Sequence, residues 1–204
     1  MILTEIEKEL KQIKPFFKKK LLPNIFTWQE LESLINLRPF VNDKRFTFKS
    51  KDQYTWEAGG WLTDLNSWPP DQLQKIIDNN VCYLCDSSRA NKRINTVCTE
   101  LENIFNMPTD AHIYFNKNTN EMNYDGLGRH NDMQHNLIAL AKGSIKIKIW
   151  ENNKDATYSL DEGDVIFIPK GYDHQIISHT SRISVSFAIS PQATYFQGRE
   201  WVTL

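Results

Sequence analysis

The sequence predicts a mainly β fold, a jelly roll over residues 109–204, flanked by α-helices from a largely helical first half, 1–108. Before Pro108, apolar residues recur at the three- and four-residue spacing of helices. After it, short alternating runs are separated by turn residues, as in β-sandwiches and barrels. No repeat or flexible linker divides the 204 residues, so we expect a single domain over 1–204.

The first half carries the helical signals. Apolar spacing predicts a helix from residue 2 to about 19, ending at Lys18-Lys19-Lys20, where cations suit the helix dipole. Thr27-Trp28-Gln29-Glu30 has the spacing of a capping box and predicts a second helix that stops before Pro39. The other elements expected here are a strand over Arg45–Lys49, a helix after Pro69-Pro70-Asp71, and an amphipathic helix from Asn91 to about Phe105.

The second half alternates between apolar and polar residues. Turn residues such as Gly143, Gly163 and Pro169-Lys170-Gly171 separate its short runs. The predicted strands are Ala111–Phe115, Asn136–Ala141, Ser144–Trp150, Ala156–Leu160, Asp164–Ile168, Gln175–Ser178 and Arg182–Ile189.

The charge of the chain is nearly balanced, with 24 basic and 25 acidic residues. This balance disfavours broad electrostatic binding to nucleic acid. No run approaches the ~20 apolar residues that span a bilayer, and the N-terminus lacks the pattern of a signal peptide. Together with an odd number of cysteines, these features predict a cytoplasmic protein with reduced thiols and no membrane partner.

Cysteines and aromatic residues suggest fewer functions. Cys82 and Cys85 have C-x-x-C spacing, but no second pair completes a zinc site, so we interpret them and Cys98 as packing residues. The tryptophans Trp56, Trp61 and Trp68 either anchor a core or line a substrate cleft. The candidate substrate contacts are Trp56, Trp61, Tyr124 and Tyr172.

Two histidines and one aspartate form the candidate metal site. His130 and Asp132 are two residues apart, so on a strand their side chains share a face. His174 begins a later strand, after the turn Pro169-Lys170-Gly171. Two imidazoles and a carboxylate on one face form the facial triad of non-haem Fe(II) oxygenases, which leaves positions open for substrate and O₂. The sequence therefore predicts His130, Asp132 and His174 as catalytic iron ligands.

The other histidines fit this site less well. His135 lies five residues after His130, so strand alternation turns its side chain to the other face. His179 lies five residues after His174, beyond a polar turn. His112 and Tyr114 share a face of the preceding strand and can reach the site. Without a metal, these histidines would be surface or hydrogen-bonded residues of a jelly roll.

The region 126–187 resembles the JmjC or cupin-like family of Fe(II)/2-oxoglutarate oxygenases, nearest to its asparaginyl-hydroxylase and ribosomal-oxygenase branch. The resemblance rests on the H-x-D pair and on the run from Gly163 to His174, and it extends back to the strand His112–Asn116. It implies a double-stranded β-helix, iron on the three residues above, and a contact of Asn136 with 2-oxoglutarate.

One position departs from the family pattern. In the family, a Lys or Arg two residues after the glycine that closes this strand pair anchors the far carboxylate of 2-oxoglutarate, but here Ile145 follows Gly143 at that distance. Lys146 and Lys148 are one residue out of register and should point outward. A buried dicarboxylate without a cation is costly, so another residue supplies the charge or the cosubstrate differs.

Arg182 is our candidate for the missing cation. Alternation places Arg182, Ser184 and Ser186 on one face of their strand. In the prolyl-hydroxylase relatives, a basic residue at a similar distance past the distal histidine has the anchoring role, and a guanidinium can donate two parallel hydrogen bonds to a carboxylate. Ser184 and Tyr114 are further candidate contacts. The alternatives are that Arg182 is a solvent-exposed turn residue, or that Lys146 is the anchor in a shifted register.

These features predict an Fe(II)- and 2-oxoglutarate-dependent dioxygenase that uses O₂ to hydroxylate a protein side chain or a small molecule. Ile145 keeps a second hypothesis open, a cupin metalloenzyme that does not use 2-oxoglutarate, either an isomerase or another dioxygenase. A non-catalytic binding module on the same fold is the third.

Overall fold

The computed structural model describes residues 2–36, 46–49, 74–75, 77–78, 80–85, 87–117, 124–125, 128–151, 154–178 and 180–190. The predictions made for Trp56, Trp61, Trp68, His179 and the side chain of Tyr124 lie outside the described residues. Within the described part, no helix is long and apolar enough to cross a bilayer.

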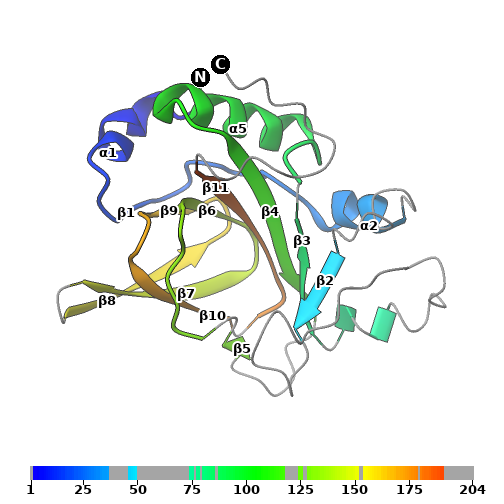
Figure 1. Cartoon of the computed structure of the whole chain (residues 1–204). Coiled ribbons are helices and arrows are strands. Elements are labelled where there is room, and N and C mark those ends of the chain that lie inside the picture. The colour runs from blue at the N-terminus through cyan, green and yellow to red at the C-terminus, as the bar shows by residue number, and fades with distance from the viewer. Residues whose placement is uncertain are drawn as a thin grey trace.

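Two antiparallel sheets form the body of the protein (Figure 1). In spatial order, the larger sheet contains β1 (Phe16–Lys18), β9 (Val165–Ile168), β6 (His135–Lys142), β11 (Arg182–Ile189), β4 (Thr109–Asn116), β3 (Val81–Leu84) and β2 (Phe46–Lys49). The smaller sheet contains β5 (Tyr124–Asp125), β10 (Asp173–Ser178), β7 (Ser144–Glu151) and β8 (Lys154–Asp161). From β4 to β11 the chain passes back and forth between the sheets, with β7 and β8 as a hairpin within one of them. This winding confirms the predicted jelly roll, a double-stranded β-helix.

The first half of the chain extends the larger sheet as well as covering it. The helix predicted for residues 2 to 19 is wrong beyond the second turn: η1 (Thr4–Ile6) and α1 (Glu7–Lys11) are followed by strand β1. Pro15 explains the break, because it lacks an N–H and disfavours a helical residue before it. β1 instead pairs with β9, with Phe16 opposite Phe167. Strand β3 was not predicted.

The longer helices follow their capping signals. α2 (Trp28–Asn36) starts at the predicted capping box, where Glu30 N donates to Thr27 Oγ1 and the Thr27 hydroxyl donates to Glu30 Oε2. α5 (Lys92–Phe105) is capped by Asn91, whose side chain accepts from Ile94 N at 2.8 Å. Residues 74–75 and 77–78 are helical, where the sequence predicts a helix after Pro69-Pro70-Asp71.

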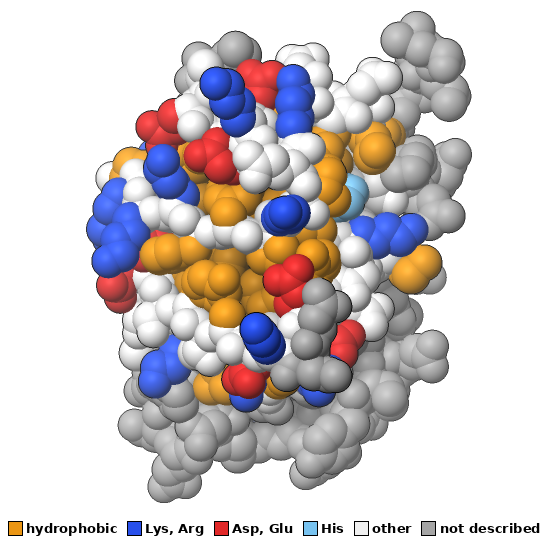
Figure 2. Space-filling model, turned by 90° about the vertical axis from the view of Figure 1, so that its left-hand side faces the viewer, with side chains coloured by type: hydrophobic (Ala, Val, Ile, Leu, Met, Phe, Trp, Pro, Cys, Tyr) orange, Lys and Arg blue, Asp and Glu red, His pale blue; other side chains and the backbone are white. Residues whose placement is uncertain are grey.

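Apolar side chains fill two layers. One cluster packs the helices and the N-terminal segment against the outer face of the larger sheet, with Leu10, Leu101 and Phe187 fully buried. The other fills the space between the sheets, around Ile147 and Ile166. Figure 2 shows a face of the molecule on which apolar side chains gather within a ring of charged ones. The polar site lies inside the roll, beside the second cluster.

Candidate metal centre and its cavity

The segment that carries His130 and Asp132 lies against strand β10. His130 N donates to His174 O at 3.0 Å and His174 N donates to His130 O at 2.7 Å, which forms an isolated antiparallel bridge. Gly171 N donates to Asp132 O at 3.0 Å. The expectation that these two residues begin a strand is therefore wrong in detail, because β6 starts only at His135. The bridge to β10, not strand alternation, brings the three side chains together.

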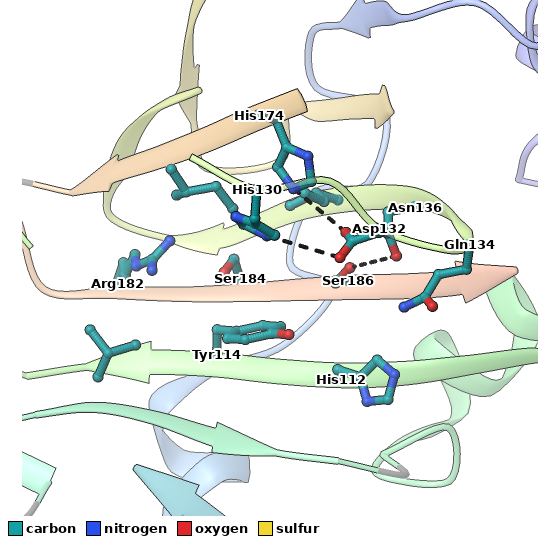
Figure 3. A pocket seen from close by; sticks show the side chains of 13 residues that line it. His112, Tyr114, His130, Asp132, Gln134, Asn136, His174, Arg182, Ser184 and Ser186 are labelled. Atoms are coloured by element: carbon teal, nitrogen blue, oxygen red, sulfur yellow. Dashed lines mark hydrogen bonds and ion pairs between the residues drawn. The ribbon is translucent and has the colours of Figure 1, made fainter. Parts of the chain in front are cut away.

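The two imidazoles present the same nitrogen to the carboxylate. Nδ1 of His130 lies 2.9 Å from Gly128 O, and Nδ1 of His174 lies 3.1 Å from Tyr172 O. A carbonyl only accepts hydrogen bonds, so each Nδ1 carries a proton, and in the neutral form of the ring Nε2 is the nitrogen with the free lone pair. These Nε2 atoms lie 3.9 Å and 3.6 Å from oxygens of Asp132 (Figure 3). The arrangement leaves three potential ligand atoms facing one another.

The ligand atoms of His130, Asp132 and His174 lie within 4.8 Å of one another, a grouping that can hold a metal ion. Asp132 is held from a neighbouring strand, because Asn136 Nδ2 donates to Asp132 Oδ2 and Ser186 Oγ donates to Asn136 Oδ1 at 3.4 Å. Burial lowers the pKa of His174, which favours the neutral imidazole that a metal requires.

His135 lies elsewhere, as its spacing predicts. Its Nδ1 accepts a hydrogen bond from Lys170 N at 3.0 Å, and its ring stacks near Phe105 and Phe167. Burial, with the nearby Lys170 cation, lowers its pKa. His135 is therefore a packing residue at the start of β6.

The three potential ligands line a cavity that opens to solvent. Its walls come from β3, β4, β6, β10 and β11 and from the segment before β6. The lining residues are Val81, His112, Tyr114, His130, Asp132, Gln134, Asn136, Ile138, His174, Ile176, Arg182, Ser184 and Ser186. Alternation on β11 therefore placed Arg182, Ser184 and Ser186 on the cavity face, as predicted.

Arg182 is buried at the cavity wall, with 2% of its surface exposed, so it is not a turn residue in solvent. Its Nε donates to Asn116 Oδ1 at 3.2 Å, whereas its buried Nη1 has no hydrogen-bond partner among the described residues. Within the same residues, no carboxylate forms an ion pair with it. Burial lowers the pKa of Arg182 to about 10, so the guanidinium stays protonated at neutral pH. A buried cation with an unused donor is costly unless an anion binds there.

Lys146 lies outside this cavity. The backbone pairing places Lys146 opposite Ile177, on the outer face of the smaller sheet, and its side chain is exposed. Ile145, on the inner face, packs in the apolar cluster between the sheets. The position on β7 is thus an apolar contact, and the buried cation that lines the cavity, Arg182, lies on β11.

The wall formed by β3 and β4 contains residues that the sequence interpretation partly missed. Tyr83 Oη lies 2.9 Å from His112 Nδ1, and the rings of Tyr83 and Tyr114 lie 4.8 Å apart. Burial lowers the pKa of His112 to about 4 and raises that of Tyr114 above its usual value. Both side chains are therefore neutral over the physiological range.

Gln134 and Val81 also line the cavity without having been predicted to do so. Gln134 shares the parity of Asp132 in the sequence, which was an available signal, whereas Val81 belongs to the unpredicted β3. Tyr172, a candidate substrate contact, donates from its hydroxyl to Glu151 Oε1 at 3.1 Å and does not line the cavity.

The thiols take no part in this site. Cys82, Cys85 and Cys98 are buried, as the interpretation as packing residues requires. Burial raises the pKa of Cys82 well above its usual value, so its reactive thiolate is disfavoured.

A scan of protein-family models finds no match, and a search of curated proteins finds no relative. Among solved structures, YcfD, a ribosomal oxygenase from Escherichia coli, has 15% identity and a TM-score of 0.57 over 87% of this chain and 48% of that one. A complex of YcfD with cobalt and 2-oxoglutarate gives 14% and 0.57 over the same shares. A further YcfD structure gives 14% and 0.59 over 91% of this chain and 52% of that one. The chain spans about half the length of these proteins, and the similarity shows a shared fold.

Proposed function

We propose that this protein is an Fe(II)- and 2-oxoglutarate-dependent oxygenase of the JmjC or cupin-like kind. The observation that carries the proposal is one cavity with two opposite chemical ends. Two imidazoles and a carboxylate converge at one end, and a buried guanidinium with one nitrogen unbonded among the described residues lines the other wall. A metal ion needs the first set of groups, and a dicarboxylate cosubstrate needs the second.

The donor set fits iron. His130 and His174 would bind through Nε2 and Asp132 through its carboxylate, a combination of ligands suited to Fe(II) that leaves other positions open. Once bound there, iron with O₂ and 2-oxoglutarate supplies the oxidising power for hydroxylation. The carbonyls of Gly128 and Tyr172 fix the two ring orientations, because each accepts an Nδ1–H. Asn136 holds one carboxylate oxygen of Asp132 in place.

Arg182 would anchor the far carboxylate of 2-oxoglutarate. Its Nη1 is buried and has no partner in the described part of the chain, so a carboxylate would satisfy it through a charge-assisted hydrogen bond. Ser184 lines the cavity from the same face of β11, and Tyr114 lies on the neighbouring β4, opposite Ser184 in the pairing. Both can donate hydroxyl hydrogen bonds to the same anion. Lys146, exposed on the outer face, would not take part.

The apolar walls have a separate task. Val81, Ile138 and Ile176 line the cavity beside the polar groups. They limit the number of water molecules near the reacting centre, and excluding water strengthens electrostatic interactions and suppresses side reactions. The protein thus contributes orientation, charge and exclusion of water, while the bound groups supply the chemistry.

We propose a protein side chain or a small molecule as the substrate. YcfD is named a ribosomal oxygenase, and this name is the support for a protein substrate. The near-neutral charge of the chain, −1, gives no support for a nucleic-acid substrate.

The test is turnover of 2-oxoglutarate. Purified protein with Fe(II), ascorbate and 2-oxoglutarate should form succinate and consume O₂ slowly. Both rates should rise when lysate proteins are added, and mass spectrometry should find added oxygen in one of these proteins. Oxygen consumption that does not depend on 2-oxoglutarate would instead indicate a different cupin dioxygenase. Absence of metal binding by the purified chain would contradict both.

A further inference from the structure

The segment that carries His130 and Asp132 is tied to the smaller sheet by one carboxylate. Asp173, the residue before His174, accepts hydrogen bonds from the side chains on both sides of His130. Arg129 donates from Nε and Nη2 to Asp173 Oδ2 at 2.9 and 2.7 Å, and Asn131 Nδ2 donates to Asp173 Oδ1 at 2.9 Å. The carboxylate thus joins the two parts of the chain that carry the proposed ligands.

Trp150 completes this tie from strand β7. It lies opposite Asp173 in the pairing of β7 and β10. The Arg129 guanidinium lies 4.5 Å from the centre of the Trp150 ring, which is a cation–π contact. Arg129 is therefore held by the indole face and by two hydrogen bonds to one carboxylate oxygen.

This tie matters because the segment has little regular structure of its own. His130 belongs only to an isolated bridge, and β6 begins at His135. Three backbone hydrogen bonds, which involve the amides of His130, Gly171 and His174, join the segment to the chain around β10. The contacts of Asp173 lie beside these bonds.

We propose that Asp173 is a positioning residue, which holds the His130–Asp132 segment on β10 so that the three ligand side chains stay within bonding reach of one metal ion. The inference rests on the proposed metal site. The Asp173 carboxylate is hydrogen-bonded to Arg129 and Asn131, and we assign its positioning effect to these two residues. An exposed ion pair contributes little to global stability, so the effect should be local.

The chain offers a matched control. On the neighbouring strand, Asp155 pairs with Lys148 at 2.8 Å, and the Lys148 ammonium lies 5.1 Å from the centre of the same Trp150 ring. Asp155 therefore makes the same kind of contact on the same sheet, but its ion pair lies within the β7–β8 hairpin and not on the segment that carries His130 and Asp132.

The experiment compares Asp173→Ala with Asp155→Ala in the full chain by titrating the metal-free protein with Co(II). We expect Asp173→Ala to weaken Co(II) binding by about tenfold or more, the effect typical of residues that orient metal ligands, and to alter the visible Co(II) spectrum. The Co(II) affinity of Asp155→Ala should be within about twofold of the wild-type affinity, as expected for the loss of a surface ion pair. Equal Co(II) affinity in Asp173→Ala and wild type would overturn the proposal.

Hydrogen exchange in the metal-free protein gives a readout that does not need metal. In Asp173→Ala, the amides of His130, Gly171 and His174 should exchange faster than in Asp155→Ala. If the wild type does not bind Co(II), the proposed function fails, but the exchange comparison still tests the role of Asp173. Equal exchange rates in Asp173→Ala and Asp155→Ala would reject that role. Should Asp173→Ala fail to fold, Arg129→Met removes the hydrogen bonds and keeps apolar contact with Trp150. It should then show the same changes to a smaller degree, and wild-type behaviour would count against the tie.

Discussion

The two ends of the cavity are built in different ways. Arg182, Ser184 and Ser186 lie on β11, which pairs with β4 on one side and β6 on the other. All three are buried. His130 and Asp132 instead lie in an irregular segment, with about a quarter of each side chain exposed. The end of the cavity that would bind the carboxylate is fixed by sheet pairing, while the metal end depends on individual hydrogen bonds.

This difference predicts which changes the site tolerates. A side chain on a central strand keeps its direction even when a neighbour changes, because the backbone ladder sets it. A ligand in an irregular segment keeps its position only while its ties last. Substitutions of the potential ligands should therefore change metal affinity, and substitution of Arg182 should change cosubstrate affinity alone.

The largest effect should follow from removing a metal ligand. We expect Asp132→Ala or His174→Ala to lower metal affinity by well over the roughly 100-fold seen for residues outside the ligand set, and to bring turnover down to background. His135→Ala is the control, because His135 lies outside the cavity and bonds to Lys170. Metal titration and succinate formation measure both. If His135→Ala lost metal and His174→Ala kept it, the ligand assignment would be wrong.

The next effect concerns the arginine end alone. In Arg182→Met, the loss of a charge-assisted contact should weaken the binding of 2-oxoglutarate by about 1.5–3 kcal/mol, which raises the apparent KM roughly 10- to 150-fold. Metal affinity without cosubstrate should not change. Lys146→Met, on the exposed outer face, should leave the KM unchanged. The reverse result, with only Lys146→Met affected, would require the anchor to lie on β7.

Much of the fold is predictable because its signals are local. Apart from the two-residue β5, which was not predicted, the strands from β4 to β11 follow alternation between turn residues, and the predicted bounds of β7 and β11 differ from the structure by one residue at most. β1 and β3 were missed because their pairing partners lie far along the chain. The run that contains Val81 is short and apolar on both faces, so periodicity alone does not distinguish it from a buried helical segment.

The sequence indicates which residues line both ends of the cavity, but not how those residues are held in place. Spacing selected the three residues whose potential ligand atoms the structure brings together, and alternation gave the cavity face of β11. The burial of Arg182 was not predictable, since it depends on Asn116 of β4 and on the close approach of Gly143 to the chain beside Arg182. A Cβ on Gly143 would lie 2.1 Å from Ser181 O. The tie through Asp173 needs three separate segments to meet, and no sequence pattern indicates this.

A moderate effect is expected in the wall formed by β4, where His112 is buried. Its pKa of about 4 in the folded protein lies below the unfolded value of about 6.5. The unfolded state therefore binds the proton more readily, so this contribution to stability is present above pH 6.5 and is lost as the pH falls toward 4. The Asp110 carboxylate, 4.0 Å from Nε2, is too distant for a hydrogen bond and does not offset burial.

Urea unfolding of metal-free protein tests this at pH 7 and pH 5. Between pH 7 and pH 5, the free energy of unfolding of the wild type should fall by about 2 kcal/mol more than that of His112→Gln, which cannot take up the proton. Other titrating groups act on both proteins and cancel in the difference. Equal losses in the two proteins would show that the folded imidazole is charged or hydrated.

The smallest effect should come from the contact that joins the two ends. Ser186, at the arginine side, donates to Asn136 Oδ1 at 3.4 Å, and Asn136 donates to Asp132. A neutral hydrogen bond this long should contribute at the low end of about 0.5–1.5 kcal/mol, so Ser186→Ala should weaken metal binding by only about two- to fivefold. Ser184→Ala, on the same face of β11 but without this contact, should leave metal affinity unchanged.

The route of this effect can be tested with a double-mutant cycle. If Ser186 acts on the metal only by orienting the Asn136 amide, then Ser186→Ala adds nothing in an Asn136→Ala background. Additive effects would mean that Ser186 acts by another route, and the two ends of the cavity would then be joined through more than this chain of side chains. A result without additivity would identify Asn136 as the residue through which the rigid sheet steadies the less regular metal end.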